Sequence, residues 1–235
     1  MINAEKILSL PKLNKDDTFT FGCNRCGNCC REREDILLTP LDLFKMAGYL
    51  NAPSVDVLSK YCEMYEGRDS KLPLVRIKPR EYRGTCPFAK KEGCLIHPVK
   101  PAVCALFPLG RMTDVRTNEF SYLLQPVTCG NKNQTQTVRQ WLDGFSMLEE
   151  EGFTMMWHQK AGEISTVLRD IYSRSTSNHE AINAGLFVIL YLQYDLSGEF
   201  MPQFKDNCEE ALGIIRAISE EAVQVNTGDC CLEQL

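Results

Sequence analysis

The sequence predicts an α+β fold with more helix than strand, in which a loop-rich cysteine-cluster domain packs against a C-terminal helical bundle. Nine of the twelve cysteines lie between Cys23 and Cys129, and ten of the eleven prolines precede Gln134. Prolines and clustered cysteines are typical of turns and loops, whereas the segment after Gln134 carries apolar residues at helical spacing. We therefore expect a cysteine-rich metal- or cluster-binding domain at residues 1–133 and a helical domain at residues 134–235.

The first domain is expected to contain two short helices and a little strand. Thr39-Pro40-Leu41-Asp42 supplies a capping residue, a proline at the first helical position and a capping-box acid, which predicts a helix over residues 40–50. A second helix is expected over residues 54–65, stopped by Gly67. Residues 72–78 alternate between apolar and polar well enough to predict a short strand, with residues 120–127 as its partner.

The second domain is expected to contain four helices joined by short polar loops. Apolar residues recur at helical spacing over residues 138–148, 164–171 and 211–225, and residues 178–194 form the fourth apolar segment. We interpret these stripes as core packing. His158 and His179 fall on two of these helices and are interpreted as structural, because neither has a second ligand at helical spacing. The end of the chain, from residue 226, is expected to fray.

Composition narrows the class of protein. A net charge of -5 argues against a nucleic-acid groove, which needs a basic surface. The most apolar segment, residues 181–194, is too short to span a bilayer, and the first residues lack the pattern of a secretory signal. We therefore expect a cytoplasmic protein. Because the cytosol keeps thiols reduced, twelve cysteines then favour metal or cluster ligation over disulfides.

The strongest motif is Cys23-Asn24-Arg25-Cys26-Gly27-Asn28-Cys29-Cys30, in which two Cys-x-x-Cys steps share Cys26. Gly27 permits the left-handed backbone that such a turn often needs. Three cysteines at this spacing match the start of a ferredoxin-type run, whereas zinc usually takes one pair from each of two segments. We therefore favour an iron–sulfur cluster of the 4Fe-4S type, with zinc as the alternative. Because adjacent side chains diverge, Cys30 is expected to serve a second centre or to be a buried thiol.

Four further thiols follow the motif at wider spacing: Cys86, Cys94, Cys104 and Cys129. Pro87 stiffens the loop after its cysteine, as in ferredoxins. The predicted metal ligands are therefore eight cysteines, enough for two four-ligand sites: Cys23, Cys26, Cys29, Cys30, Cys86, Cys94, Cys104 and Cys129. His97, three residues after Cys94, is either a further ligand or a hydrogen-bonded histidine beside a turn.

The remaining cysteines and the nearby cations have simpler interpretations. Cys62 and Cys208 are expected to be buried small residues on helices, and Cys230 and Cys231 fall in the tail and are left out of the site. Four cations could compensate the charge of a thiolate centre: Arg31, Arg33, Lys100 and Arg111. For Arg31 and Arg33 we favour surface pairing with Glu32, Glu34 and Asp35. Arg111 is retained as the candidate cofactor-binding residue.

The ordered cysteines resemble the CxxCxxCC family, also called the YkgJ-like cysteine cluster family and described as zinc- or iron-chelating domains. The resemblance rests on the doubled cysteine, then Cys86-Pro87-Phe88, the stretch from Gly93 to Pro101, Cys104 and Phe107-Pro108, and it covers about residues 21–129. Flagellin lysine N-methylases carry a similar cysteine cluster, which implies an enzymatic relative. The family commonly has arginines where this chain has Lys100 and Ala105.

These observations predict a protein that holds an iron–sulfur cluster or zinc through its cysteines, with a role in redox chemistry or protein modification. The alternative is a structural zinc-binding or metal-handling module without catalysis. No phosphate loop, serine-nucleophile elbow or zinc-protease helix motif is present in the sequence, so the question of enzymatic activity stays open. The expected partner is the metal or cluster, with no nucleic acid, no membrane span and an unidentified protein partner or substrate.

Overall fold

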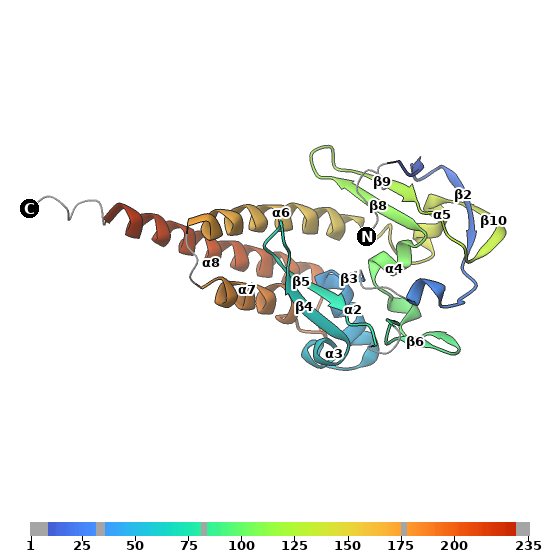
Figure 1. The fold of residues 1–235 in the computed structure, drawn as a ribbon, viewed down its shortest axis with the longest axis horizontal. Helices are drawn as coiled ribbons and strands as arrows, with labels where there is room; N and C mark the ends of the chain where they lie inside the picture. The colour runs from blue at the N-terminus through green and yellow to red at the C-terminus, as the bar shows by residue number, and fades with distance from the viewer. Residues whose placement is uncertain (1–8, 32–35, 81–83, 175–177, 229–235) are drawn as a thin grey trace, which may run out of the picture. The chain divides into compact units, whose positions relative to one another are not determined.

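The computed structural model describes residues 9–31, 36–80, 84–174 and 178–228, and it confirms a mixed α+β fold with more helix than strand (Figure 1). The strands are short: β1 (Lys12–Leu13), β2 (Thr18–Gly22), β3 (Leu37–Leu38), β4 (Cys62–Glu66), β5 (Pro73–Ile77), β6 (Ala89–Lys90), β7 (Gly93–Cys94), β8 (Leu109–Asp114), β9 (Glu119–Leu124) and β10 (Asn131–Thr137). The α-helices are α2 (Pro40–Leu50), α3 (Ser54–Tyr61), α4 (Ala102–Leu106), α5 (Val138–Asp143), α6 (Glu151–Arg174), α7 (His179–Phe187) and α8 (Phe200–Gly228). Two 3-10 turns, η1 (Asn28–Cys30) and η2 (His97–Val99), and a π-helix, η3 (Val188–Leu192), complete the described elements.

The chain packs as two compact units. The first comprises Met1–Glu63 and Arg76–His158, and the second comprises Met64–Val75 and Gln159–Leu235. All nine cysteines from Cys23 to Cys129 fall in the first unit. The division of the sequence at residue 133 was drawn from composition and motifs rather than from packing, and it stays a prediction.

Two small antiparallel assemblies organise the first unit. Strands β1, β9 and β8 form one sheet in that order, in which Lys12 pairs with Leu123 and Arg111 pairs with Tyr122. Strand β10 pairs with β2, and the register shifts between Asn131 and Thr135. The prediction that residues 120–127 pair with residues 72–78 is therefore wrong, because β9 pairs with β8 and β1 while β5 lies between β3 and β4.

Aromatic rings fill the core of the first unit. Phe19 and Phe21 on β2 meet Trp141 of α5 edge to face, with ring centroids 6.1 and 5.5 Å apart. Tyr122 of β9 and Leu109 of β8 belong to the same buried cluster. Edge-to-face packing of this kind adds to the hydrophobic stabilisation that burial of large rings provides. Cys129 and Phe107 pack against this core.

The predicted helix over residues 40–50 is confirmed as α2. Thr39 accepts a hydrogen bond from the backbone N–H of Asp42, and the Asp42 carboxylate accepts one from the backbone N–H of Thr39, which completes the capping box. Asp42 is buried, and its other oxygen accepts a hydrogen bond of 2.8 Å from the backbone N–H of Ala102. One carboxylate therefore joins the start of α2 to the start of α4.

The predicted helix over residues 54–65 ends early. Helix α3 stops at Tyr61, and Cys62 begins strand β4, so the placement of Cys62 on a helix is wrong. The reason is a nonlocal pairing: β4 joins β5 at the edge of a three-stranded sheet. The predicted strand at residues 72–78 is confirmed as β5, Pro73–Ile77.

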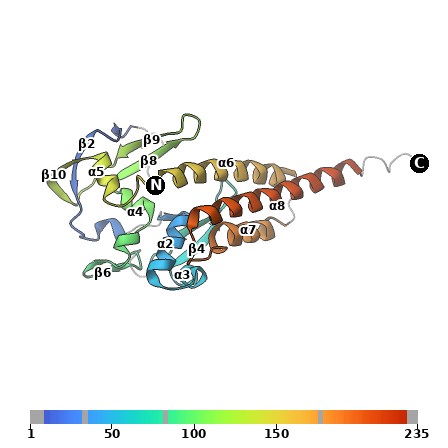
Figure 2. The same cartoon turned by 180° about the vertical axis from the view of Figure 1, so that it is seen from behind.

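Helices dominate the second unit, and Figures 1 and 2 both show α6, α7 and α8 running side by side. Lys160 of α6 forms an ion pair of 2.8 Å with Glu209 of α8, and Tyr172 donates a hydrogen bond to the carbonyl of His179. The predicted apolar stripes at residues 164–171 and 211–225 supply buried residues such as Ile164 and Leu212. All four helical segments predicted after residue 134 contain helix, and His158 and His179 lie on α6 and α7 as expected.

Two details of the helical segments differ from expectation. Strand β10 extends to Thr137, and α5 after it is only six residues long and packs in the core of the first unit. The segment after α7 continues as the π-helix η3 rather than as regular α-helix. In the part of the chain that the structure describes, no helix combines the length and apolar character needed to cross a membrane.

Candidate metal centre

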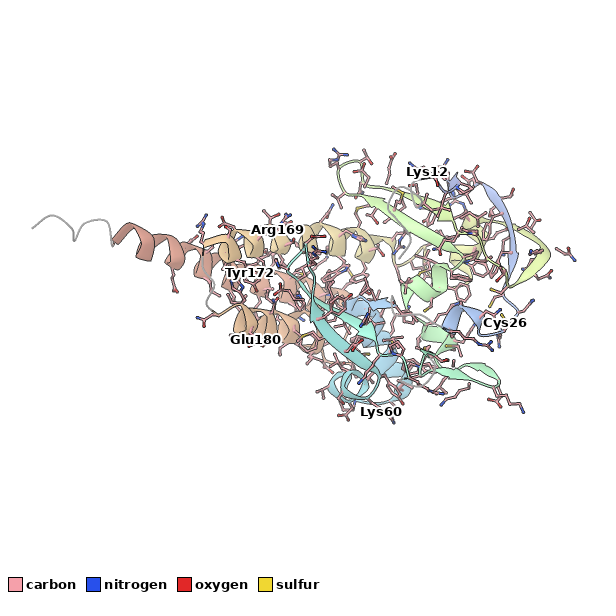
Figure 3. All side chains as sticks on the ribbon, in the orientation of Figure 1. Lys12, Cys26, Lys60, Arg169, Tyr172 and Glu180 are labelled. Atoms are coloured by element: carbon pink, nitrogen blue, oxygen red, sulfur yellow. The ribbon has the colours of Figure 1, made fainter. Side chains whose placement is uncertain are left out.

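The eight predicted ligands come from six places in the first unit. Cys23 and Cys26 lie on the loop that follows β2, while Cys29 and Cys30 lie in the turn η1. Downstream, Cys86 precedes β6, Cys94 ends β7, Cys104 lies in α4, and Cys129 lies just before β10. Figure 3 labels Cys26 on the loop after β2. Cys23 and Cys26 are exposed, Cys86 is buried, and the other five are of intermediate exposure.

A left-handed residue shapes the loop as the sequence predicts. Gly27 has φ of 74°, and its carbonyl accepts a hydrogen bond of 3.0 Å from the backbone N–H of Cys30. Arg25 also has a positive φ, of 52°, which is uncommon for a residue with a side chain. The two left-handed residues flank Cys26, and the turn that follows Gly27 carries Cys29 and Cys30.

Apolar contacts fix the start of this loop. Phe21, at the end of β2, packs edge to face on Phe107 just after α4, with centroids 6.0 Å apart. Gly130 has φ of 90°, and a Cβ at that position would lie 2.3 Å from the ring of Phe21. Gly130 thus lets the segment carrying Cys129 approach β2 closely. The loop, α4 and the start of β10 consequently meet beside the aromatic core.

Backbone hydrogen bonds fix Cys86 and Cys94 near the turn η1. The N–H of Cys86 donates to the carbonyl of Cys30 at 2.9 Å. Strands β6 and β7 form a hairpin in which Ala89 pairs with Cys94, and the N–H of Ala89 donates to the carbonyl of Cys86. Arg25 passes over the hairpin, with its Cβ 3.9 Å from the position of a Cβ on Gly93.

The thiols line two adjoining cavities. The first cavity, of about 70 Å³, is lined by six of the eight cysteines: Cys23, Cys29, Cys30, Cys86, Cys94 and Cys104. The second, of about 30 Å³, is lined by five: Cys23, Cys26, Cys29, Cys104 and Cys129. Each exceeds the ~15 Å³ that one small guest such as a water molecule needs. The structure therefore brings all eight predicted ligands around one pair of cavities.

The neighbouring thiols of Cys29 and Cys30 do not diverge as expected. Their sulfur atoms lie 4.0 Å apart. Two sulfurs on one tetrahedral zinc lie about 3.8 Å apart, given a Zn–S bond of about 2.3 Å. The expected divergence of the two side chains is therefore wrong, because the turn η1 brings both sulfurs close together, and their assignment to separate centres stays a prediction. Among the described residues, however, no group of three or more His, Cys, Asp or Glu is already closed around one point.

Burial and mutual proximity raise the pKa of four of these thiols and so favour their protonated form. The hydrogen bond with Cys29, followed by burial, raises the pKa of the Cys30 thiol. Burial also raises the pKa of Cys86, Cys94 and Cys129, and the nearby thiol of Cys26 adds to the shift at Cys129. Thiolates crowded into a half-buried space repel one another, and a cation among them removes that cost.

Four basic residues share the first cavity with the thiols: Arg25, Lys90, His97 and Lys100. Lys100 also lines the second cavity, and its Nζ lies 3.8 Å from the centroid of the Phe145 ring. Burial lowers the pKa of Lys100, while the thiols of Cys23, Cys104, Cys29 and Cys94 oppose that shift. Burial, then Lys100 and Arg25, lower the pKa of His97, which favours the neutral imidazole that a metal requires. Ligation by His97 stays a prediction.

The cations singled out from the sequence lie in different places. Lys100 is at the thiols, whereas Arg111 is on β8, where its Nη2 donates to Thr154 at 2.9 Å and its guanidinium lies over Phe120. Arg111 lines neither cysteine cavity, and its role in binding a cofactor stays a prediction.

Arg31 is exposed, and Arg33 with its proposed acidic partners lies outside the described residues. Sequence reasoning missed Arg25, although its place inside the first Cys-x-x-Cys step could have indicated it.

The cysteines excluded from the site are consistent with that exclusion where they are described. Cys62 and Cys208 are buried, as predicted, and line neither cavity. Burial, followed by the nearby thiol of Cys86, raises the pKa of Cys62 to about 12. Burial likewise raises the pKa of Cys208 to about 12. Cys230 and Cys231 lie outside the described residues.

Comparison with known proteins agrees with the motif. An uncharacterized protein of Methanocaldococcus jannaschii, MJ0661, is 34% identical over 112 residues, which cover 46% of this chain and 56% of that protein. The chain thus matches a little over half the length of this relative. No solved structure matches the chain. Residues 22–130 match the model of the CxxCxxCC family, described as "Putative zinc- or iron-chelating domain". The resemblance expected from the motifs is therefore confirmed over residues 22–130, where the chain matches the CxxCxxCC family.

Proposed function

We propose that this protein holds an iron–sulfur cluster of the 4Fe-4S type through thiols of its CxxCxxCC motif and of the downstream cysteines in its first unit. The observation that carries the proposal is that all eight thiols, spread over more than a hundred residues of sequence, line two adjoining cavities. Only Cys86 of the eight is buried, so the packing of cysteine as a small apolar residue does not account for their convergence.

The donor set fits a soft metal. Sulfur ligands select zinc, copper(I) and iron–sulfur clusters, whereas magnesium, calcium and manganese prefer carboxylate and carbonyl oxygens. No Asp or Glu lines either cavity, so the described walls offer sulfur, with one imidazole from His97. The cavities therefore suit a zinc- or iron-based centre, in agreement with the description of the matching family.

The choice of iron–sulfur over zinc rests on the triple run of Cys23, Cys26 and Cys29 on one loop. In ferredoxins such a run supplies three ligands to clusters, while structural zinc sites take pairs from separate segments. The test is purification under anaerobic conditions, followed by analysis of iron, acid-labile sulfide and zinc. Iron and sulfide in equal amounts with a brown colour support the cluster. A colourless protein with stoichiometric zinc and no iron would establish the zinc alternative.

The role of the centre divides two hypotheses. We favour a redox reaction or modification of a protein substrate, because the ionisable groups of Arg25, His97 and Lys100 stand beside the thiols in the first cavity. The alternative is a structural or metal-handling module whose centre is closed by four thiolates. X-ray absorption at the metal edge separates them: four sulfurs per zinc indicate a closed structural site, and a nitrogen or oxygen neighbour indicates an open or reactive one.

A further inference from the structure

The two cavities sort the eight thiols into three groups. Cys30, Cys86 and Cys94 line only the first cavity, and Cys26 and Cys129 line only the second. The three that line both are Cys23, Cys29 and Cys104. Each of these five thiols thus lines only one of the two cavities. A single four-ligand centre would leave four of the eight thiols without a metal, and a centre confined to one cavity would leave the thiols that line only the other cavity unused.

Backbone contacts hold the first exclusive group together. The N–H of Cys86 donates to the carbonyl of Cys30 at 2.9 Å, and its own carbonyl accepts from Ala89 at 3.1 Å. Ala89 in turn pairs with Cys94 across the β6–β7 hairpin. Cys30 and Cys86 are therefore joined by a main-chain hydrogen bond, and Cys94 lies opposite Ala89 in the hairpin that follows Cys86.

A different scaffold holds the second exclusive group. Cys129 lies two residues before Asn131, which pairs with Gly22 at the end of β2, and Cys26 lies on the loop that leaves β2. The close approach at Gly130, where no Cβ fits beside Phe21, keeps the two segments together. The β2–β10 ribbon thus fixes Cys26 and Cys129, just as the β6–β7 hairpin fixes Cys86 and Cys94.

We propose that the cysteine cluster holds two adjoining metal centres, one built on Cys30, Cys86 and Cys94 and the other on Cys26 and Cys129. This inference rests on the proposed metal-binding function. A four-thiolate centre needs one further thiol in the first group and two in the second. The two centres together need three further thiols, and three thiols line both cavities: Cys23, Cys29 and Cys104.

The position of Lys100 agrees with two neighbouring anionic centres. Two centres that are each bound by four thiolates carry net negative charge and repel each other across a short distance. Lys100 lines both cavities, and its ammonium lies over the Phe145 ring rather than in open solvent. A half-buried cation at the junction of the cavities reduces this repulsion. Lys100 is a charge-compensating residue in this arrangement and not a ligand.

Paired substitutions test the number of centres. Protein carrying Cys86→Ser with Cys94→Ser should retain the centre of the second cavity, and protein carrying Cys26→Ser with Cys129→Ser should retain that of the first. Each pair should therefore lower the metal content of the anaerobically purified chain by about half relative to wild type, because each removes two ligands from one centre. The matched control is Cys62→Ala with Cys208→Ala, two buried cysteines outside the cavities, which should keep the full content.

Native mass spectrometry of the wild-type chain gives a measurement that does not depend on how the variants fold. Two separate mass increments, each corresponding to an ion or a cluster, are expected. One increment, or complete loss of metal from both paired variants while their far-ultraviolet helical signal persists, would overturn the two-centre assignment. Wild-type protein that carries no metal at all would instead overturn the proposed function, so the two failures are distinguishable.

Discussion

Two cysteines of this chain can both be buried and still differ in whether other thiols lie near them. Cys86 and Cys208 are both buried, yet Cys86 faces a cavity that five other thiols share, whereas Cys208 lies in α8 and lines no cysteine cavity. Cys62 is near Cys86 but begins strand β4 and lies outside both cavities. The exposure of a cysteine therefore does not identify it as a candidate ligand. Its position beside other thiols around a shared cavity does.

The first prediction concerns single substitutions. Changing Cys86 to serine should lower metal content, because a neutral hydroxyl is a much poorer ligand than a thiolate. The same change at Cys208 should leave metal content intact, at a stability cost of about 1–3 kcal/mol for burying a hydroxyl. Elemental analysis with thermal unfolding measures both effects. Loss of metal from Cys208→Ser with Cys86→Ser silent would place the ligands in the second unit.

The second prediction concerns pH. Raised pKa values at Cys30, Cys86, Cys94 and Cys129 keep these thiols protonated in the metal-free chain at neutral pH. Binding requires thiolates, so each metal taken up should release protons, and the apparent affinity should rise with pH until the pH passes these raised values. Titration calorimetry in buffers of different ionisation enthalpy counts the protons. An affinity that is constant between about pH 6.5 and 8.5 would contradict the proposed thiolate ligation.

The third prediction concerns the cation among the thiols. Lys100→Gln removes positive charge from a half-buried position near four thiols, so metal should transfer to a competing chelator faster than in wild type. Lys100→Arg keeps the charge, and its transfer rate should stay within about twofold of wild type. The rates are followed by absorbance of the chelator complex. Equal acceleration by both substitutions would show that the shape of Lys100, rather than its charge, matters.

Among the elements, local signals were predicted well and nonlocal ones were not. Helix α2 follows from Thr39, Pro40 and Asp42, which are adjacent in sequence, and its bounds agree with the prediction. The end of α3 and the start of β4 depend on pairing with β5, which no local signal in the helix reveals. Strand β10 has the polar sequence NKNQTQT and mostly exposed side chains, so it carries no apolar alternation to detect.

The candidate site shows the same limit. Its eight candidate thiols can be read directly from the motif and the cysteines that follow it in the sequence. Their division between two cavities depends on a β-hairpin, a ribbon and the turn at Gly27, which only the fold brings together. The same holds for Asp42: the sequence predicts its capping role in α2, but not its hydrogen bond to Ala102, sixty residues away.

The fourth prediction concerns the hydrogen bond from the backbone N–H of Ala102 to the Asp42 carboxylate. Asp42→Ala leaves the N–H of Ala102 without its partner at the start of α4, the helix that carries Cys104. We expect a loss of about 1–3 kcal/mol in the free energy of unfolding, together with weaker metal binding, because an unpaired buried donor costs its desolvation energy and loosens the ligand-bearing turn. Chemical denaturation and chelator competition measure the two effects.

Thr39→Val is the matched control for Asp42. It removes the hydroxyl that accepts from the N–H of Asp42 but leaves the bond between Asp42 and Ala102. It should cost about 0.5–2 kcal/mol, as the loss of other helix caps does, with metal affinity unchanged. Equal loss of metal affinity in the two variants would mean that Asp42 acts through α2 alone and does not position α4.

For the whole molecule, the two units differ in what stabilises them. The thiol-bearing loops at residues 23–31 and 84–104 contain few regular elements and belong to the first unit, where the aromatic core lies to one side of them. The second unit is built from α7, α8 and most of α6, with buried aliphatic residues such as Ile164, Leu168 and Leu212. Hydrophobic burial of that kind does not depend on a metal.

The fifth prediction follows from this difference. Removing metal with a chelator should increase amide hydrogen exchange at residues 23–31 and 84–104, because the thiols then repel or separate instead of closing around an ion. Exchange in α7 and α8 should change little, and most of the far-ultraviolet helical signal should persist. Hydrogen-exchange mass spectrometry with and without chelator resolves the segments. If protection in α7 and α8 falls together with that of the loops, the chain unfolds as one cooperative unit, and metal binding contributes to the stability of the whole protein rather than of its first unit alone.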